Sequence, residues 1–333
     1  MNTINWGIIA PGNIADKFAT ALRGVAGAAL YSVASRTPEK AAAFANRHGF
    51  ETYATNYDAL INDPKVDAIY IASPHMLHAE QSIACLKAAK AVLCEKPMAV
   101  NSQDAQKVVN IARQQNTFFM EAVWTRFMPV HNKIQQWINN GRIGEVQMVQ
   151  ASFGFARNFT PEHRLFDPQL AGGALLDIGI YPITMAQIAI GGTPQRITAM
   201  AELGRSGVDE NLGVLLHYPQ GQIATLNASL RANTSWDAWI FGSEGSIHIP
   251  LFWFAESATL FSGSMPTMTE VEKIAHPHQI NGYEYEIEEV HRCLNEGLLE
   301  SPLMSWQESI QVMGIMDEVR SQIGLRYPFE NDD

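Results

Sequence analysis

The stretch WGIIAPGNIA, residues 6–15, decides how the rest of the chain is interpreted. Its first five residues form a short apolar run typical of a strand, and an amphipathic segment with helical spacing follows at 14–22. Gly12 lies in the turn between them, where a dinucleotide fingerprint needs a glycine so that the backbone can approach a pyrophosphate. The spacing matches G-x-G-x-x-G imperfectly, because Ala10 replaces the first glycine and Ala15 the third. Support for a nucleotide site must therefore come from the surrounding pattern.

The N-terminal part of the chain alternates short β-rich apolar runs with Ala-rich amphipathic stretches, which predicts repeated βαβ units on a parallel sheet. Thr37 and Asn101 are expected N-caps of two of the helices. We therefore predict a doubly wound Rossmann domain at residues 1–122. The expected strands are 6–10, 28–35, 67–72, 91–95 and 117–121, and the expected helices are 14–22, 38–48, 76–89 and 102–115.

Beyond residue 145 the pattern changes to period-two alternation interrupted by turn signals, which predicts a large, mostly antiparallel sheet in a second α/β domain at 123–333. Such a sheet needs cover on its open face, and a second subunit is a reasonable candidate, so we expect a homodimer through this sheet. Two late amphipathic helices, 283–296 and 306–323, can pack on either domain. The expected strands are 146–153, 196–201, 213–218, 222–229 and 237–242.

Composition excludes several classes of partner. The 333 residues carry a formal net charge of -11, which disfavours nucleic acid and anionic membrane surfaces. The apolar runs are too short to span a bilayer, and the N-terminus has no pattern of a secretory leader, so we expect a cytoplasmic protein. The three cysteines form no CxxC pair, and the histidines at 75 and 78 lack a third clustered ligand, so we expect no disulfide framework and no metal site.

The end of the second predicted strand bears on the choice of cofactor. NAD-binding domains place an acidic residue there to hold the ribose hydroxyls, whereas this chain has ASRT at 34–37. Ser35 and Thr37 can donate hydrogen bonds to a 2'-phosphate, and the planar guanidinium of Arg36 suits it as well. We therefore expect NADP rather than NAD. The alternative is that Arg36 is only a solvated residue at a strand end.

The predicted strand 91–95 delivers Glu95, Lys96 and Pro97 to the carboxyl edge of the sheet, where open α/β folds bind ligands. A lysine in a cleft at this edge can hold the oxygen of a secondary alcohol or relay its proton. Pro97 would fix the adjacent backbone, and a cis bond before it is a conformation that proline alone makes accessible at low cost. Taken alone, this pattern is better explained by an ordinary surface lysine before a helix-starting proline.

Together with 67–74 (DAIYIASP) and His78, the Glu95-Lys96-Pro97 turn resembles the Gfo/Idh/MocA oxidoreductase family over nearly the whole chain. Within that family, 120–127 (MEAVWTRF) is similar to the dimeric dihydrodiol dehydrogenase and NADP-dependent D-xylose dehydrogenase subgroup. The resemblance implies a Rossmann domain, a second domain whose open sheet serves dimerisation, and a lysine, here Lys96, that contacts substrate and cofactor. The cofactor contacts we expect are Ala10, Pro11, Gly12, Asn13, Ile14, Ser35, Arg36, Thr37, Ser73, Pro74, His78, Glu95 and Lys96.

The resemblance implies a second motif at 172–181 (GGALLDIGIY), in which this chain and the subgroup have a tyrosine where many relatives have histidine. Asp177 and Tyr181 are four residues apart and would share one face of a helix. A phenol beside a cation becomes an effective acid or base, so Lys96, Tyr181 and Asp177 are the expected catalytic residues. The alternative is that Asp177 only caps the N-terminus of the helix and Tyr181 only packs one turn further on. By the same resemblance Trp124, Phe153 and Trp253 are expected substrate walls, although most aromatic residues at such positions are core.

These features predict an NADP-dependent enzyme that moves a hydride between the nicotinamide and a sugar, polyol or trans-dihydrodiol carbon, or the corresponding carbonyl. One alternative is a non-catalytic sensor or scaffold of the same fold that binds the dinucleotide. Reduction of a conjugated or imine bond and NAD-dependent glycoside cleavage also stay open. The sequence does not identify the substrate.

Overall fold

The structure, a computed structural model, describes residues 3–330 and divides into two units. The N-terminal unit runs to Trp124 and also contains His278–Ile310, and the C-terminal unit comprises Thr125–Pro277 and the residues from Gln311 on. The predicted boundary at 122/123 lies next to the first division, but the sequence pattern placed 278–310 in the second domain. Helix α8 (Glu284–Glu296) belongs to the N-terminal unit, and α9 (Trp306–Ile323) is divided at residue 310.

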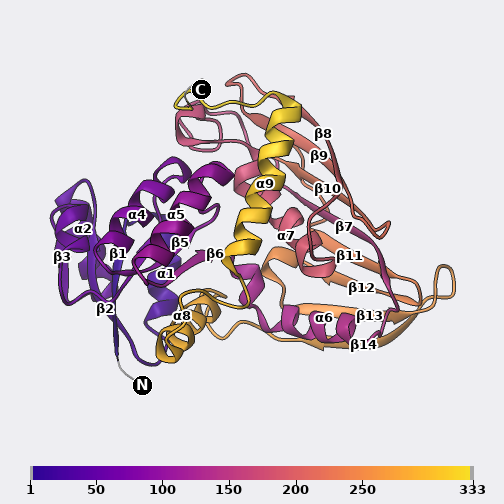
Figure 1. The fold of residues 1–333 in the computed structure, drawn as a ribbon, viewed down its shortest axis with the longest axis horizontal. Helices are drawn as coiled ribbons and strands as arrows, with labels where there is room; N and C mark the ends of the chain where they lie inside the picture. The colour runs from indigo at the N-terminus through magenta and orange to yellow at the C-terminus, as the bar shows by residue number, and fades with distance from the viewer. Residues whose placement is uncertain (1–2, 331–333) are drawn as a thin grey trace. The chain divides into compact units, whose positions relative to one another are not determined.

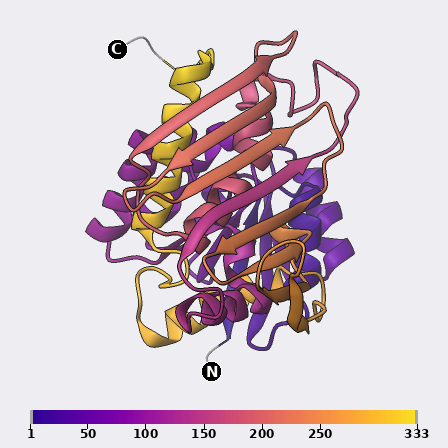
Figure 2. The ribbon, with the colours of Figure 1, turned by 90° about the vertical axis from the view of Figure 1, so that its right-hand side faces the viewer.

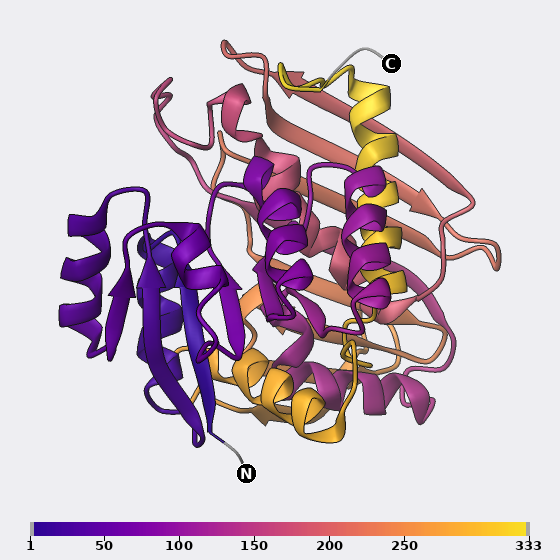
Figure 3. The ribbon, with the colours of Figure 1, turned by 60° about the vertical axis from the view of Figure 1, so that its left-hand side comes forward.

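The N-terminal unit is built on a parallel sheet of six strands in the order β3-β2-β1-β4-β5-β6, which confirms the predicted Rossmann fold (Figures 1 and 3). Every residue of β4 and β5 is buried, as expected for central strands of a sheet covered on both faces. Along the chain the strands are β1 (Ile4–Ile9), β2 (Ala28–Ala34), β3 (Thr52–Ala54), β4 (Ala68–Ile71), β5 (Ala91–Glu95) and β6 (Phe119–Ala122).

The helices of this unit begin close to the predicted positions. Asn101 caps α5 by accepting a hydrogen bond from the Asp104 amide at 2.8 Å, as predicted. Thr37 occupies the N-cap position of α2, but its side chain makes no capping bond. Helices α1 and α8 pack together, and so do α4 and α5. Besides α8, the helices are α1 (Asn13–Leu22), α2 (Pro38–His48), α3 (Tyr57–Ile61), the short η1 (His75–Leu77), α4 (His78–Lys87) and α5 (Ser102–Gln114).

The C-terminal unit contains an eight-stranded sheet in the order β14-β13-β12-β11-β7-β10-β9-β8. Neighbouring strands are antiparallel except β7 and β10, which run parallel. The predicted mostly antiparallel sheet is therefore confirmed. Its strands are β7 (Val146–Gly154), β8 (Arg196–Leu203), β9 (Asp209–His217), β10 (Ile223–Ser229), β11 (Asp237–Gly242), β12 (Gly245–Pro250), β13 (Ser257–Ser262) and β14 (Thr269–Ala275).

One face of this sheet is covered by helices. Helix α7 (Ile180–Ala189) packs on β7, β10 and β11, and all its residues are buried, which explains its lack of a polar face. Helix α6 (Pro129–Asn139) packs beside it against β13, and Gln322 of α9 hydrogen-bonds the backbone of β8. Short turns complete the unit: η3 (Pro168–Leu170), the π-helical η4 (Leu175–Gly179) and η5 (Phe252–Phe254), while η2 (Trp124–Phe127) begins at the division.

The other face of the sheet carries no helix in Figure 2, where the strands lie in front. In β9, Leu212, Val214 and Leu216 are buried on the covered face, and the residues between them are exposed. The open face includes Met200, 78% exposed, and Leu215, 50% exposed. The alternation predicted from the sequence thus reflects a sheet with one covered face.

Several elements escaped prediction. The five strands predicted for the C-terminal half do not include β12, β13 or β14, and β3, α3 and α6 were also not predicted. The reason in β14 is that Glu272, on the covered face, is a carboxylate whose charge is balanced by Lys133 and Arg142, so the period-two pattern is hidden. Among residues 3–330, no helix combines the length and apolar character needed to cross a membrane.

Candidate functional site

The turn between β1 and α1 has the conformation of a dinucleotide fingerprint. Ala10, which replaces the first glycine, has a φ of 65°, in the left-handed region that favours glycine. Its carbonyl accepts a hydrogen bond from the Gly12 amide at 2.8 Å, and α1 begins at Asn13. The first amides of α1 and the positive end of its dipole therefore follow directly after this tight turn, as anion binding at a helix N-terminus requires.

The structure itself does not require a glycine at position 12. Its φ is −105°, which other residues adopt readily, and an added Cβ would meet nothing nearer than the Ala10 carbonyl oxygen at 4.0 Å. A side chain here would fill the space in front of the first turn of α1. Free space, rather than backbone strain, thus accounts for a glycine at this position. This space is available to a bound pyrophosphate, so the residues at the turn fit that group.

The end of β2 carries no carboxylate, since Ala34 is followed by Ser35, Arg36 and Thr37. Ser35 is buried and its hydroxyl accepts a hydrogen bond from the Thr37 amide at 3.2 Å, whereas Arg36 is exposed. Sequence reasoning missed Tyr57 at the start of α3, a half-buried phenol whose pKa is raised by burial, with the charge of Arg36 opposing that shift. Arg36 and Tyr57 therefore lie together beyond β2.

His78 joins the turns that follow β4 and β5. Its Nδ1 lies 2.7 Å from the carbonyl oxygen of Pro97, and its Nε2 lies 2.8 Å from that of Ser73. The imidazole is fully buried, and carbonyl oxygens only accept hydrogen bonds. A neutral imidazole carries one N–H, so it donates to one of these oxygens and lies in contact with the other. The Ser73 hydroxyl in turn donates to Gln81 Oε1 at 2.7 Å. His78, one of the expected cofactor contacts, thus joins two of the turns predicted to bind the cofactor.

The Glu95-Lys96-Pro97 turn is held by buried side chains. The Lys96–Pro97 bond is cis, which the sequence analysis had considered. Glu95 accepts hydrogen bonds from the Tyr70 hydroxyl and, at 3.2 Å, from the Lys96 amide. The carboxylate of Glu121, on β6, accepts a bond from the Met98 amide at 2.8 Å. The backbone on both sides of the half-buried Lys96 is therefore fixed.

Glu286 of α8 is a buried carboxyl that sequence reasoning missed. It is 0% exposed, and burial together with the charge of Glu95 raises its pKa well above the ordinary value. The same two causes, with burial first, raise the pKa of Tyr70. In the sequence, Glu286 is one of several glutamates on an amphipathic helix. Only the packing of α8 distinguishes it from the other glutamates.

In the C-terminal unit, the segment carrying Asp177 and Tyr181 is helical, which is the condition for the two residues to share one face. Its first turn is the π-helix η4, and α7 continues from Ile180. Both side chains are buried. Asp177 accepts a hydrogen bond from Arg164 at 2.9 Å and forms an ion pair with it. Arg164 was not predicted, because it comes from an irregular loop whose path the sequence does not specify.

Aromatic side chains gather around Tyr181. The rings of Phe153 and Trp253 stack with centroids 3.8 Å apart, and the Phe153 and Tyr181 rings lie 5.8 Å apart. Trp236, which was not predicted, stands edge-on to Trp253 at 5.4 Å. Of the three predicted wall residues, Phe153 thus lies beside Tyr181, and Trp253 stacks on Phe153. The third, Trp124, belongs to the N-terminal unit, where its ring lies 4.8 Å from that of Tyr283.

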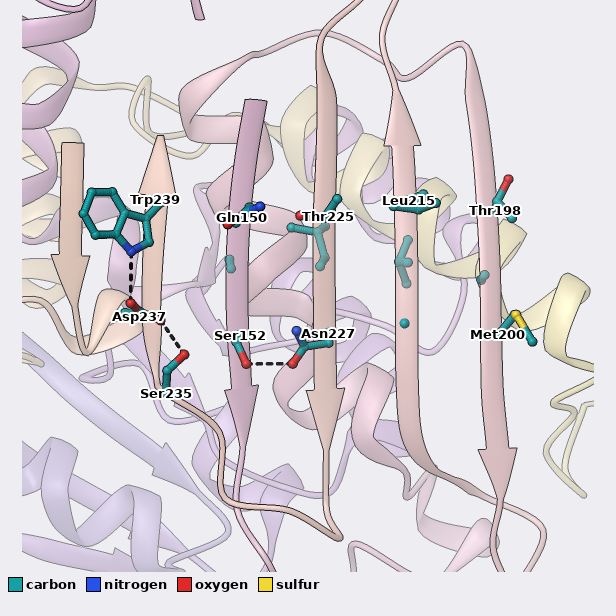
Figure 4. Close-up of a pocket in the computed structure, with 15 residues that line it drawn as sticks. Gln150, Ser152, Thr198, Met200, Leu215, Thr225, Asn227, Ser235, Asp237 and Trp239 are labelled. Atoms are coloured by element: carbon teal, nitrogen blue, oxygen red, sulfur yellow. Dashed lines mark hydrogen bonds between the residues drawn. The ribbon is translucent and has the colours of Figure 1, made fainter. Parts of the chain in front are cut away.

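A hollow of about 440 Å³ lies on the open face of the large sheet, and Figure 4 shows its lining. It faces away from α7, so it does not belong to the Asp177 and Tyr181 site. Ser152 and Asn227 hydrogen-bond across neighbouring strands at 2.7 Å, and Trp239 donates to Asp237 at 3.2 Å. The exposed side chains of Met200 on β8 and Leu215 on β9 make that part of the hollow apolar.

Comparisons with known proteins agree with this geometry. Residues 4–123 match the oxidoreductase family with an NAD-binding Rossmann fold, and residues 131–248 match the GFO/IDH/MocA C-terminal domain. Trans-1,2-dihydrobenzene-1,2-diol dehydrogenase of Xenopus laevis is 36% identical over 329 residues, covering 97% of this chain and 99% of that protein. The enzyme of the same name from Mus musculus is 34% identical over 98% of both chains.

Among solved structures, KijD10, a 3-ketoreductase from Actinomadura kijaniata in complex with NADP and TDP-benzene, aligns with a TM-score of 0.86 and 26% identity over 97% of this chain and 98% of that chain. Levoglucosan dehydrogenase in complex with NADH and L-sorbose aligns with a TM-score of 0.88 over 97% of both chains, at 21% identity, and shows the shared fold. From these matches and the geometry of the two units, the chain belongs to the Gfo/Idh/MocA family of oxidoreductases with an NAD-binding Rossmann domain.

Proposed function

We propose that this protein is an NADP-dependent dehydrogenase or reductase acting on a CH–OH carbon of a sugar, polyol or trans-dihydrodiol, or on the corresponding carbonyl. The observation that carries the proposal is the fixed Glu95-Lys96-Pro97 turn at the carboxyl edge of the Rossmann sheet, where ligands bind in such folds. The names of its curated relatives favour a dihydrodiol, and that of KijD10, a 3-ketoreductase, favours reduction of a carbonyl.

For the cofactor, we propose that Ala10 to Ile14 and the first amides of α1 hold the pyrophosphate. Ser35, Arg36 and Thr37 would hold the 2'-phosphate of NADP, since a carboxylate that would repel it is absent from the end of β2. Ser73, Pro74, His78, Glu95 and Lys96 line the turns after β4 and β5 and complete the cofactor set. The bound nicotinamide would supply the hydride acceptor or donor.

For the chemistry, we propose that the Lys96 turn and the helix with Asp177 and Tyr181 serve the same reaction. Lys96 donates a hydrogen bond to the reacting oxygen and stabilises negative charge on it. In oxidation the phenolate of Tyr181 would take up the alcohol proton, and in reduction the resulting phenol would return it to the substrate oxygen. Asp177, already paired with Arg164, orients a substrate hydroxyl group. Trp124, Phe153 and Trp253 provide apolar walls that suit the face of a sugar ring or a cyclic diol.

We further propose that the protein is a homodimer through the open face of the large sheet. That face carries exposed apolar side chains, including Met200 and Leu215, next to paired polar groups such as Ser152 and Asn227. An apolar patch with a polar surround is typical of a protein interface.

The proposed activity is tested by following NADPH formation at 340 nm with a panel of aldoses, polyols and a trans-dihydrodiol, and repeating each assay with NAD. We expect turnover of one substrate class with NADP. Tight NADPH binding, measured by fluorescence, without turnover in either direction on any substrate or corresponding carbonyl would instead favour a dinucleotide-binding sensor.

Substitution of the central lysine tests the catalytic assignment. We expect Lys96→Met to lower turnover by at least about a hundredfold, as for the loss of a positioned acid or base, and to leave NADPH affinity within several fold. Lys87→Met, at an exposed lysine of the same unit, is the matched control. A Lys96→Met enzyme near the wild-type rate would show that the site is wrongly assigned.

The turn before α1 permits a substitution that separates folding from cofactor binding. Serine is a favourable N-cap, so Gly12→Ser should leave stability unchanged or slightly higher, and its side chain should lower NADPH affinity by about tenfold or more by occupying the pyrophosphate space. Thermal unfolding and NADPH fluorescence titration measure the two effects. Gly314→Ala, in a helix where an added Cβ meets no atom within 4 Å, controls for the loss of a glycine. Unchanged NADPH affinity in Gly12→Ser would place the pyrophosphate elsewhere.

Arg36 determines the preference between the two cofactors in this proposal. We expect Arg36→Ala to raise the Michaelis constant for NADP by about tenfold, because a charge-assisted bond to the phosphate is lost, and to leave that for NAD unchanged. Steady-state kinetics with both cofactors provides the measurement and its internal control. An equal change with NADP and NAD contradicts a role in binding the 2'-phosphate.

The dimer is tested on the open face. Wild-type protein should have the mass of two chains in light scattering after size exclusion, and Leu215→Glu should have the mass of one, because burying an unpaired charge opposes association. Leu303→Glu, at an exposed leucine of the N-terminal unit, should stay dimeric. A monomeric wild-type protein at micromolar concentration would refute this part of the proposal.

A further inference from the structure

Two glycines precede the helix that carries Asp177 and Tyr181, and each lies against a different part of the C-terminal unit. A Cβ at Gly172 would stand 2.7 Å from the carbonyl oxygens of Arg164 and Leu165. Gly173 has a φ of 119°, and a Cβ there would stand 2.1 Å from Asp209 Oδ1. A side chain at Gly172 would require the backbone at 164–165 to shift, and one at Gly173 would displace the Asp209 carboxyl and would be strained at that φ, so the turn is held closely on both sides.

Asp209 holds the beginning of the helix. It is the first residue of β9, it is 0% exposed, and its Oδ2 accepts a hydrogen bond from the Leu175 amide at 2.7 Å. Leu175 is the first residue of the π-helical turn that contains Asp177. A carboxylate from a distant strand thus does what an N-cap side chain does in an ordinary helix.

The C-terminal tail holds the other side of the same turn. The Tyr327 hydroxyl donates a hydrogen bond to the Gly172 carbonyl oxygen at 2.7 Å. Arg320 of α9 lies over the Tyr327 ring, 4.7 Å from its centroid, and forms ion pairs with Glu330 and, at 3.9 Å, with Asp317. The tyrosine is thereby fixed in place, and the glycine turn is bonded from β9 and from the tail.

Burying the carboxyl of Asp209 at this position lowers the stability of the folded protein. Burial raises its pKa to about 7, even though the Leu175 amide and the charge of Arg320 act in the opposite direction. Tyr327, whose own pKa is raised by burial, is the other titratable group beside it. A buried acid that costs stability is explained when its geometry serves a function.

We propose that Asp209 and Tyr327 are positioning residues of the active site, which act through the Gly172–Gly173 turn to fix the helix that carries Asp177 and Tyr181. The catalytic part of this inference rests on the proposed function. Neither residue needs to contact the substrate. Loss of either bond lets the first turn of the helix move, and the proton-carrying phenol then spends less time in its reactive position.

The first experiment compares Asp209→Ala with Asp209→Asn, which keeps an acceptor oxygen of the same shape. We expect Asp209→Ala to lower kcat by about tenfold or more with the Michaelis constant for NADP within about twofold, and Asp209→Asn to recover kcat to within about threefold of wild type. A merely structural role would not produce this split and rescue. Wild-type kcat in Asp209→Ala, or an Asn variant no better than the Ala variant, would overturn the role of Asp209.

The second experiment compares two buried tyrosines that are each 2% exposed. Tyr327→Phe removes the bond to Gly172, whereas the Tyr218 hydroxyl has no hydrogen-bond partner within residues 3–330, so Tyr218→Phe removes none. We expect kcat to fall by about threefold or more in Tyr327→Phe and to stay at the wild-type value in Tyr218→Phe. Equal kcat in both variants would overturn the role of Tyr327.

Amide hydrogen exchange tests positioning without any turnover. Peptides that cover residues 174–181 should exchange about tenfold faster in Asp209→Ala than in wild type, while peptides from β1 and β4 should be unchanged. This readout separates the two proposals: a wild-type protein inactive on every substrate refutes the proposed function, and exchange at 174–181 still tests the positioning. Unchanged exchange there would overturn the positioning inference itself.

Discussion

The hydrogen bonds of His78 are the constraint on which the N-terminal site depends. Parallel strands end at the same edge of a sheet, but the loops that follow them are free to diverge. His78 prevents this by contacting the carbonyl oxygens of Ser73 and Pro97, so that the turns after β4 and β5 are joined through one buried ring. Lys96 lies between the bonds made by His78 and those made by Glu95, and its backbone is fixed before any ligand binds. Preorganisation of this kind allows a hydrogen-bond donor to stabilise charge without first being reordered.

Both units hold the segments that carry site residues in fixed positions, but they do so with different residue types. In the N-terminal unit a histidine and two glutamates hold turns that follow strands, whereas in the C-terminal unit two glycines let a helix start closely against β9 and the tail. The π-helical turn η4 fits this picture, because π-turns within helices occur frequently at functional sites and shift the side chains that follow them. Asp177 lies within that turn and Tyr181 just after it. The spacing of four residues, read on an ideal α-helix, therefore describes their relation only approximately.

The sequence predicted what is local or periodic and missed what depends on packing. The Rossmann strands and the cap at Asn101 follow from apolar runs and residue spacing, whereas the stacking of Phe153 on Trp253 was not predicted. Strands β12 to β14 were missed because short apolar runs with charged residues inside them, such as Glu272, do not show a clear period. Arg164, Asp209 and Glu286 were missed for a different reason. Each is a common charged residue whose role comes from a contact made by a distant segment, and nothing in its neighbours along the chain distinguishes it.

Glu95 and Glu286 show why such contacts bear on the chemistry. Two buried carboxyls close to each other cannot both be ionised cheaply, so one of them retains its proton. Glu95 accepts hydrogen bonds from Tyr70 and from the Lys96 amide, which stabilise its charged form, and Glu286 is raised in pKa by burial and by the charge of Glu95. Glu286 is therefore the member of the pair that holds the proton. The turn that carries Lys96 consequently has one buried negative charge behind it rather than two, which avoids the cost of a second buried anion.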